Sequence, residues 1–161
     1  MVIVLMGVAG SGKTTVGLAL ATALGWGFRD ADEFHPPANV EKMSRGLPLT
    51  DRDRTPWLAA IRTHIEDKLA RGESAVVTCS ALKEKYRQAI VVDPARVKLV
   101  FLAGDFALIA ERMRARLGHF MKPEMLQSQF ADLEPPRDAL TVDVAQPPAA
   151  IVARIRQAFS L

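Results

Sequence analysis

Apolar and polar positions along the chain follow two alternating patterns, one typical of buried strands and the other of amphipathic helices. Residues 2–6 are all apolar and rich in β-branched side chains, which predicts a buried strand. After this run, Val16, Leu20 and Leu24 recur at helical spacing, and Gly25 follows as a stop signal. The predicted strands are 2–6, 26–30, 74–79, 97–102 and 141–144. The predicted helices are 13–24, 37–45, 55–71, 83–91, 105–117, 123–132 and 148–159.

This alternation predicts an α/β fold with a five-stranded parallel sheet and helices on both faces. A length of 161 residues suits a single domain spanning residues 1–161. The paired prolines at 36–37, 135–136 and 147–148 separate elements of this domain and do not mark linkers. In open parallel sheets the ligand lies beyond the carboxyl ends of the strands, so we expect the functional residues there.

Composition narrows the class of ligand. Lys plus Arg number 21 against 18 Asp plus Glu, and this net charge of +3 suits a small anionic substrate rather than nucleic acid. Cys79 is the only cysteine, so no internal disulfide is expected. The apolar run at 2–6 is too short for a signal-peptide core or a membrane span, so we expect a cytoplasmic protein without a membrane partner.

A phosphate-binding loop follows the first predicted strand. Residues 7–14 read G-V-A-G-S-G-K-T, which fits G-x-x-x-x-G-K-[ST] between a predicted strand and a predicted helix. Backbone N–H groups of such a loop converge on the phosphates of ATP, the lysine reaches the β- and γ-phosphates, and the threonine hydroxyl ligates Mg²⁺. The predicted ATP-binding residues are Gly7, Val8, Ala9, Gly10, Ser11, Gly12, Lys13, Thr14 and Thr15, with Thr14 as the metal ligand.

The remaining sequence favours a small kinase among proteins with this loop. The D-x-x-G and N-K-x-D motifs of GTPases are absent, and the chain is too short for a motor or transporter ATPase. Asp30 and Asp32 end the second predicted strand, where a carboxylate could take the proton of an acceptor hydroxyl. Asp32 is the preferred catalytic base, and a role as a solvated turn residue stays open for both. Asp93 follows an apolar run that resembles a Walker B strand, but the adjacent Pro94 indicates a helix end and a non-catalytic role.

A basic stretch predicts a lid over the nucleotide. Arg112 and Arg116 are four residues apart on a predicted helix and would meet the charge that grows on the γ-phosphoryl oxygens. The lid is predicted over about 105–136, with Gly118 as its hinge and few large apolar residues to hold it in place. A solvated basic helix face is the alternative interpretation.

Five further segments resemble the signatures of the gluconate kinase family, in order along nearly the whole chain. They are D-E-F-H-P-P-A-N-V-E-K-M at 32–43, G-L-P-L-T-D-R-D-R-T-P-W-L at 46–58, C-S-A-L-K at 79–83, G-H-F-M at 118–121 with S-Q-F and L-E-P-P at 128–130 and 133–136, and V-D at 142–143. Ala9 and Thr55 depart from the usual pattern, but Ala9 contributes only backbone and Thr55 lies at the predicted start of a helix.

The resemblance implies ATP-dependent phosphorylation of D-gluconate at its 6-hydroxyl, a nucleoside-monophosphate-kinase-like fold with a helical lid, and a homodimer. Arg54 or Lys83 would bind the gluconate carboxylate, with Arg54 preferred for its bidentate fork. The other implied substrate-binding residues are Asp32, His35, Ser80 and His119. For His35 a capping or packing role is the alternative, and Trp57 and Cys79 are predicted to be core residues.

Three other functions stay open at this point. A shikimate-kinase-like enzyme would use a similar Asp-x-Asp motif, here residues 30–32, and an adenylate-type kinase would share the lid. A non-catalytic ATP-binding regulatory module would need the phosphate loop but neither the acceptor carboxylate Asp32 nor the lid arginines.

Overall fold

The computed structural model describes residues 1–116 and 123–161 and contains one parallel sheet. The strands in this part of the chain are β1 (Val2–Met6), β2 (Gly27–Asp30), β3 (Ala75–Thr78), β4 (Val97–Ala103) and β5 (Leu140–Asp143). Their order across the sheet is β2-β3-β1-β4-β5, and every neighbouring pair is parallel. The predicted five-stranded parallel sheet is therefore confirmed.

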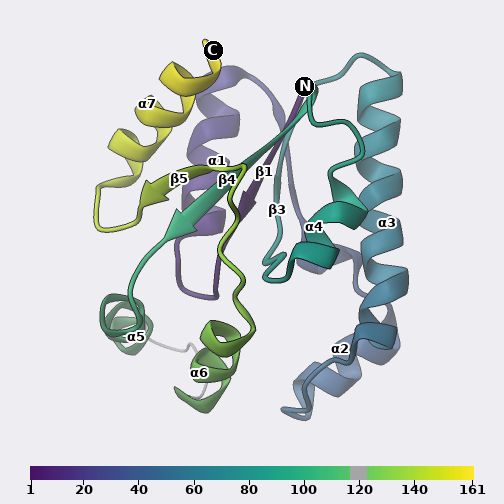
Figure 1. The fold of residues 1–161 in the computed structure, drawn as a ribbon, viewed down its shortest axis with the longest axis vertical. Coiled ribbons are helices and arrows are strands. Elements are labelled where there is room, and N and C mark those ends of the chain that lie inside the picture. Colours follow the sequence, from purple (N-terminus) through teal and green to yellow (C-terminus); the bar gives the residue numbers. More distant parts are fainter. Residues whose placement is uncertain (117–122) are drawn as a thin grey trace.

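Helices cover both faces of the sheet because the side chains of each strand alternate between them (Figure 1). On one face, α3 (Asp51–Ala70) and α4 (Glu84–Ile90) pack against Val2, Val4 and Met6 of β1. On the other face, α1 (Lys13–Leu24) and α7 (Pro148–Phe159) pack against Ile3 and Leu5 of the same strand.

The remaining elements lie beyond the carboxyl ends of the strands, at the bottom of Figure 1. They are the 3₁₀ helix η1 (Ala31–Phe34), α2 (Pro37–Ser44), α5 (Phe106–Ala115) and α6 (Pro123–Asp132). The sequence did not predict η1, whose single turn is too short to show a periodic pattern. These elements place the segments that carry the candidate chemistry at one edge of the sheet.

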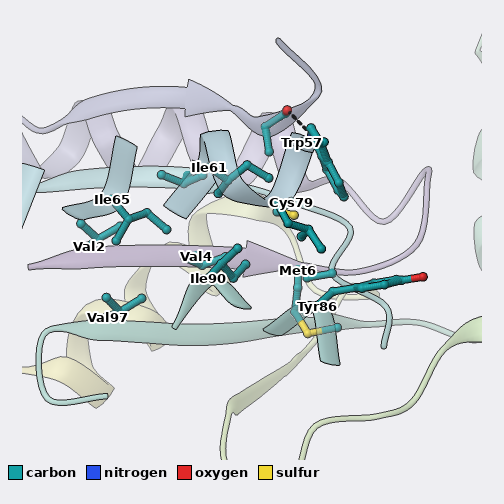
Figure 2. Packing of buried hydrophobic residues seen from close by; sticks show 14 of the residues in the cluster. Val2, Val4, Met6, Trp57, Ile61, Ile65, Cys79, Tyr86, Ile90 and Val97 are labelled. Carbon is teal, nitrogen blue, oxygen red and sulfur yellow. Dashed lines mark hydrogen bonds between the residues drawn. The ribbon is translucent and has the colours of Figure 1, made fainter. Parts of the chain in front are cut away.

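Trp57 and Cys79 belong to the core beneath this edge (Figure 2), as predicted. The indole Nε1 of Trp57 donates to the carbonyl of Ala31 at 2.7 Å and so attaches α3 to the start of η1. Complete burial raises the pKa of the Cys79 thiol to about 12, so the thiol stays protonated and unreactive at neutral pH.

The start of α3 corrects one boundary of the sequence analysis. The sequence predicted a helix from Thr55, because Pro56 favours the first turn. In the structure the helix begins at Asp51, since Thr50 and Asp53 form a reciprocal capping box that fixes an earlier start. Pro56 consequently lies inside the helix. The earlier start places Asp51 and Arg54 within helix α3, at the carboxyl ends of the strands.

No helix within residues 1–116 and 123–161 combines the length and the apolar character that crossing a membrane requires.

Candidate active site

The loop between β1 and α1 has a backbone suited to binding phosphate. Gly10 and Gly12 have φ values of 76° and 91°, a left-handed conformation that side-chain-bearing residues rarely adopt. A Cβ on Gly10 would lie 2.7 Å from Cγ of Met113, so glycine also permits α5 to pack directly on the loop. Gly12 caps α1 without a side chain, which leaves the N-terminal amides of that helix available to an anion.

Lys13, the first residue of α1, extends back over this loop. Its Nζ donates to the carbonyls of Gly7 and Val8, each at 3.0 Å. Burial lowers the pKa of Lys13, and the negative charges of Asp32 and Asp30 oppose that shift. The ammonium group therefore lies where loop amides and acidic side chains from β2 and η1 meet.

Asp30 and Asp32 have different surroundings, which separates their roles. Asp30 accepts hydrogen bonds from the Thr14 hydroxyl at 3.3 Å and from the backbone N–H of Asp32 at 3.0 Å. The Asp32 side chain is 81% exposed, and no residue within 1–116 and 123–161 donates such a bond to its carboxylate, which leaves it available to a substrate. Partial removal from water by the surrounding protein, followed by the charge of Asp30, raises the pKa of Asp32. This combination supports Asp32 as the base and Asp30 as a cap of η1.

His35 connects Asp32 to the core and presents little surface to a substrate. Its side chain is only 5% exposed and stacks on Trp57 at a ring separation of 4.5 Å. Nδ1 of His35 lies 3.3 Å from the donor Nδ2 of Asn39, which favours the tautomer with its proton on Nε2. That Nε2 lies 3.9 Å from Oδ1 of Asp32. Burial lowers the pKa of His35, so the neutral ring is favoured.

Three cationic side chains lie around Tyr86 and Asp51. Arg54 of α3 donates to the hydroxyl of Tyr86 at 3.0 Å, and its positive charge contributes to lowering the pKa of His35. Lys83, just before α4, lies 3.9 Å from Oδ1 of Asp132 at the end of α6. Lys85 pairs with Asp51. Both predicted carboxylate-binding residues are therefore in this region of the site.

The loop after β3 is held by a buried arginine that the sequence analysis missed. Ser80 is half-buried, and its carbonyl accepts from the N–H of Gly7 in the phosphate loop at 3.4 Å. Next to it, Ala81 has a positive φ of 42°. The buried Arg87 guanidinium donates to the carbonyls of Ala81 and Leu82 at 3.1 and 3.0 Å, which stabilises this conformation. Arg87 lies four residues after the third family segment, and its burial had no signal in the sequence.

A cavity of about 290 Å³ adjoins the phosphate loop and contains both predicted lid arginines. It is lined by Gly10, Ser11, Gly12, Thr15, Val16, Arg112, Ala115, Arg116, Val144, Gln146, Pro148 and Ile151. Helix α5 ends at Ala115, so Arg116 follows the helix instead of continuing its face, yet both arginines reach the cavity. The part of the wall after β5, which includes Gln146, was not predicted from sequence.

Helix α6 is attached to the phosphate loop. The N–H of Ala9 donates to Oε1 of Gln129 at 2.7 Å, and Leu126 is buried in one cluster with Val8 and Leu82. The sequence predicted few large apolar residues in this segment beyond Phe120, Leu126 and Phe130, and Leu126 and Phe130 do pack in this cluster. The lid residues Gly118 and His119 lie outside the described residues, so the predicted hinge and the predicted role of His119 remain predictions.

Asp93 lies at the opposite end of the strands from the phosphate loop, in the turn that precedes β4. Its carboxylate accepts from the N–H of Ala95 at 2.9 Å and from Nε of Arg96 at 2.7 Å. These bonds stabilise a turn and hold the pKa of Asp93 below its usual value. The distance of this turn from the phosphate loop agrees with the predicted non-catalytic role.

The oxygen donors beside the loop fit a divalent cation that is shared with ATP. The Thr14 hydroxyl and the Asp30 carboxylate lie together, and hydroxyl and carboxylate oxygens are ligands that Mg²⁺ prefers. No group of three or more His, Cys, Asp or Glu side chains suited to a metal occurs in residues 1–116 and 123–161. A divalent ion held by one or two side chains and by phosphate oxygens is compatible with this arrangement.

Comparisons with known proteins agree with this geometry. A family model described as an AAA domain matches residues 2–136. The gluconokinase of Gluconobacter oxydans (strain 621H) is 49% identical over 136 residues, which cover 84% of this chain and 76% of that protein. The crystal structure of a gluconokinase from Sinorhizobium meliloti 1021 has 47% identity and a TM-score of 0.85, covering 98% of this chain and 94% of that one.

A shikimate kinase structure from Aquifex aeolicus vf5 also superimposes on the chain, with a TM-score of 0.64 over 99% of this chain and 96% of that one. Its sequence identity is 21%, so this likeness concerns the fold alone.

Proposed function

Because the chain belongs to the gluconokinase family, we propose that it transfers the γ-phosphoryl group of ATP to the 6-hydroxyl of D-gluconate. The products are 6-phosphogluconate and ADP. One observation carries this assignment within the molecule. The phosphate loop with Lys13, the exposed carboxylate of Asp32 and a group of cationic side chains lie at the same edge of the sheet. The loop with Lys13 suits the phosphates of ATP, Asp32 suits an acceptor hydroxyl, and the cationic side chains suit a carboxylate.

Asp32 accepts the proton of the 6-hydroxyl while the oxygen of that hydroxyl bonds to the γ-phosphorus. The bond between the γ-phosphorus and the β,γ-bridging oxygen breaks, and ADP leaves with that electron pair. Lys13 stabilises the charge on the β- and γ-phosphoryl oxygens during this transfer. The neutral His35 ring beside Asp32 supports this role, because a neutral neighbour leaves the carboxylate basic.

Gluconate would bind with its carboxylate at Arg54 and with Lys83 nearby. The half-buried Ser80 would bind hydroxyl groups of the chain. His35 would bind a hydroxyl only through Nε2, since its Nδ1 faces Asn39 and the ring is packed on Trp57. His119 remains a proposed ligand from the family resemblance.

The nucleoside part of ATP would occupy the cavity beside the phosphate loop. Its volume of about 290 Å³ suits a base with its sugar, and Gln146 offers an amide that can pair with a base edge. Arg112 and Arg116 line the same cavity and would contact phosphoryl oxygens, as part of a lid over about 105–136.

Mg²⁺ would be held by the Thr14 hydroxyl, with Asp30 as its acceptor neighbour. When bound, the ion neutralises charge on the β- and γ-phosphates. From the family resemblance we also propose a homodimer in the cytoplasm. The homodimer is tested by light scattering of the purified protein.

The reaction itself is tested by ³¹P NMR of the product. With ATP, Mg²⁺ and D-gluconate, we expect one new phosphomonoester resonance that couples to the two hydrogens on C6. Coupling to a single hydrogen would show transfer to a secondary hydroxyl and would contradict the proposed position. ATP consumption without any phosphomonoester would contradict the proposed reaction.

A further inference from the structure

Tyr86 has a buried ring and a polar end at the functional edge. The residue is only 5% exposed and belongs to the cluster between the sheet and helices α3 and α4. In Figure 2 its hydroxyl extends away from the cluster, beyond Met6 at the end of β1. The core therefore fixes the position of this hydroxyl, which no proposed step of the reaction has used.

The Tyr86 hydroxyl connects an acidic and a basic side chain. It donates to Oδ1 of Asp51 at 2.5 Å and accepts from Nη1 of Arg54 at 3.0 Å. A tyrosine hydroxyl has one hydrogen, so donating it to Asp51 leaves only lone pairs toward Arg54. The negative charge of Asp51 therefore fixes the direction of both hydrogen bonds at the Tyr86 hydroxyl.

The direction of these bonds is stable over the pH range of an enzyme assay. Hydrogen bonds from Lys85 and then Tyr86 lower the pKa of Asp51 to about 2. Desolvation and the bond to Asp51 raise the pKa of Tyr86 to about 12. Asp51 consequently stays ionised and Tyr86 stays protonated from acidic to moderately alkaline solution.

Arg54 is held by a second contact with the same residue. Its guanidinium carbon lies 5.3 Å from the centroid of the Tyr86 ring, within the range of a cation–π interaction. A free arginine side chain loses rotamer entropy when it is fixed by a ligand. Holding Arg54 beforehand removes part of that cost from substrate binding.

The charges around Tyr86 leave a net positive site. Arg54, Lys83 and Lys85 lie near the carboxylate of Asp51. Lys83 also lies 3.9 Å from Oδ1 of Asp132, so one positive charge remains beyond these two carboxylates. Asp51 uses its oxygens on Tyr86 and Lys85, and Arg54 keeps donors that Tyr86 does not occupy. This excess of positive charge and of donors suits one carboxylate group.

We propose that Tyr86 and Asp51 are positioning residues that fix Arg54 for the carboxylate of the substrate, and so determine the preference for an acid over a neutral polyol. This inference rests on the proposed function, in which Arg54 binds the gluconate carboxylate. Tyr86 acts through Arg54 and does not touch the reacting atoms.

The test is a double-mutant cycle between Tyr86→Phe and Arg54→Gln in the full chain. Tyr86→Phe keeps the buried ring and removes only the hydroxyl. We expect it to raise KM for gluconate by about 3- to 10-fold, the range of one lost hydrogen bond, with KM for ATP and Tm nearly unchanged. Inhibition by D-glucitol, which lacks the carboxylate, should not weaken. Adding Tyr86→Phe to Arg54→Gln should raise KM for gluconate no further.

Arg62→Gln is the matched control, because Arg62 lies on the same helix and pairs with Glu66 at 2.9 Å on the exposed surface. Its KM for gluconate should equal that of the unmodified protein. If Arg54→Gln raises this KM but Tyr86→Phe does not, or if the two effects multiply, the positioning role is overturned and the proposed function survives. If Arg54→Gln has no effect, the carboxylate assignment fails together with this inference. Absence of gluconate phosphorylation in the unmodified protein would instead overturn the proposed function.

Discussion

Replacing Lys13 by alanine is expected to lower kcat by a factor of about 10² or more while the protein remains folded. The ammonium lies over the phosphate loop, next to the carbonyls of Gly7 and Val8. It would follow the charge on the β- and γ-phosphoryl oxygens into the transition state. Steady-state kinetics with ATP and gluconate, together with circular dichroism of the variant, provide the measurement.

Lys98→Ala is the control for this variant. Lys98 lies near the start of β4, toward the amino ends of the strands, and its Nζ donates to the carbonyl of Pro94 at 3.0 Å. Its removal should leave kcat unchanged. A folded Lys13→Ala protein with near-normal kcat would contradict the assignment of the loop as the site of phosphoryl transfer.

Replacing Asp32 by asparagine should lower kcat steeply, by about 10²-fold or more, with ATP affinity nearly unchanged. Asparagine keeps the shape of the side chain but cannot accept the proton of the 6-hydroxyl. The measurement is kcat for gluconate together with the affinity for ATP determined by titration. Asp93→Asn is the matched control, since Asp93 is a carboxylate of the distant turn before β4, and this variant should retain kcat.

The pH profile gives a second measure of the Asp32 role. The pKa of Asp32 is raised, and a base works only when it is deprotonated. Activity should therefore be present above this raised pKa and fall as the pH decreases through it, at a higher pH than for an ordinary aspartate.

If Asp32→Asn is active while Asp30→Asn is not, the two carboxylates have the opposite roles.

Sequence patterns located the sheet and the phosphate loop because both depend on neighbouring residues. The run from Val2 to Met6 is apolar throughout since helices cover both faces of that strand. Glycines and a lysine at fixed spacing are needed for the loop backbone itself, so residues 7–14 predicted its position directly.

A local signal also led to the wrong predicted start of helix α3. Pro56 suggested a helix start at Thr55, but the hydrogen bonds between Thr50 and Asp53 start the helix four residues earlier. A capping box usually contains Glu or Gln at its third helical position, and the aspartate here made the signal weaker. Asp51 was therefore missed as a neighbour of Arg54 and Tyr86.

The remaining parts of the site depend on contacts between distant segments. Ala9 and Gln129 are 120 residues apart, and their hydrogen bond exists only because α6 packs on the phosphate loop. The cavity wall at Gln146 likewise requires β5 to lie next to β4. Neither periodicity nor motif spacing carries information about such pairings.

The most direct test of the account is a coupled assay that offers D-gluconate, shikimate and AMP separately to the same protein with ATP and Mg²⁺. Membership in the gluconokinase family predicts turnover with gluconate and kcat/KM values for shikimate and AMP lower by about 10³-fold or more. Comparable or greater turnover of shikimate or AMP would contradict the assignment of gluconate as the substrate. No turnover of any of the three would contradict the assignment of this site as a kinase for these acceptors.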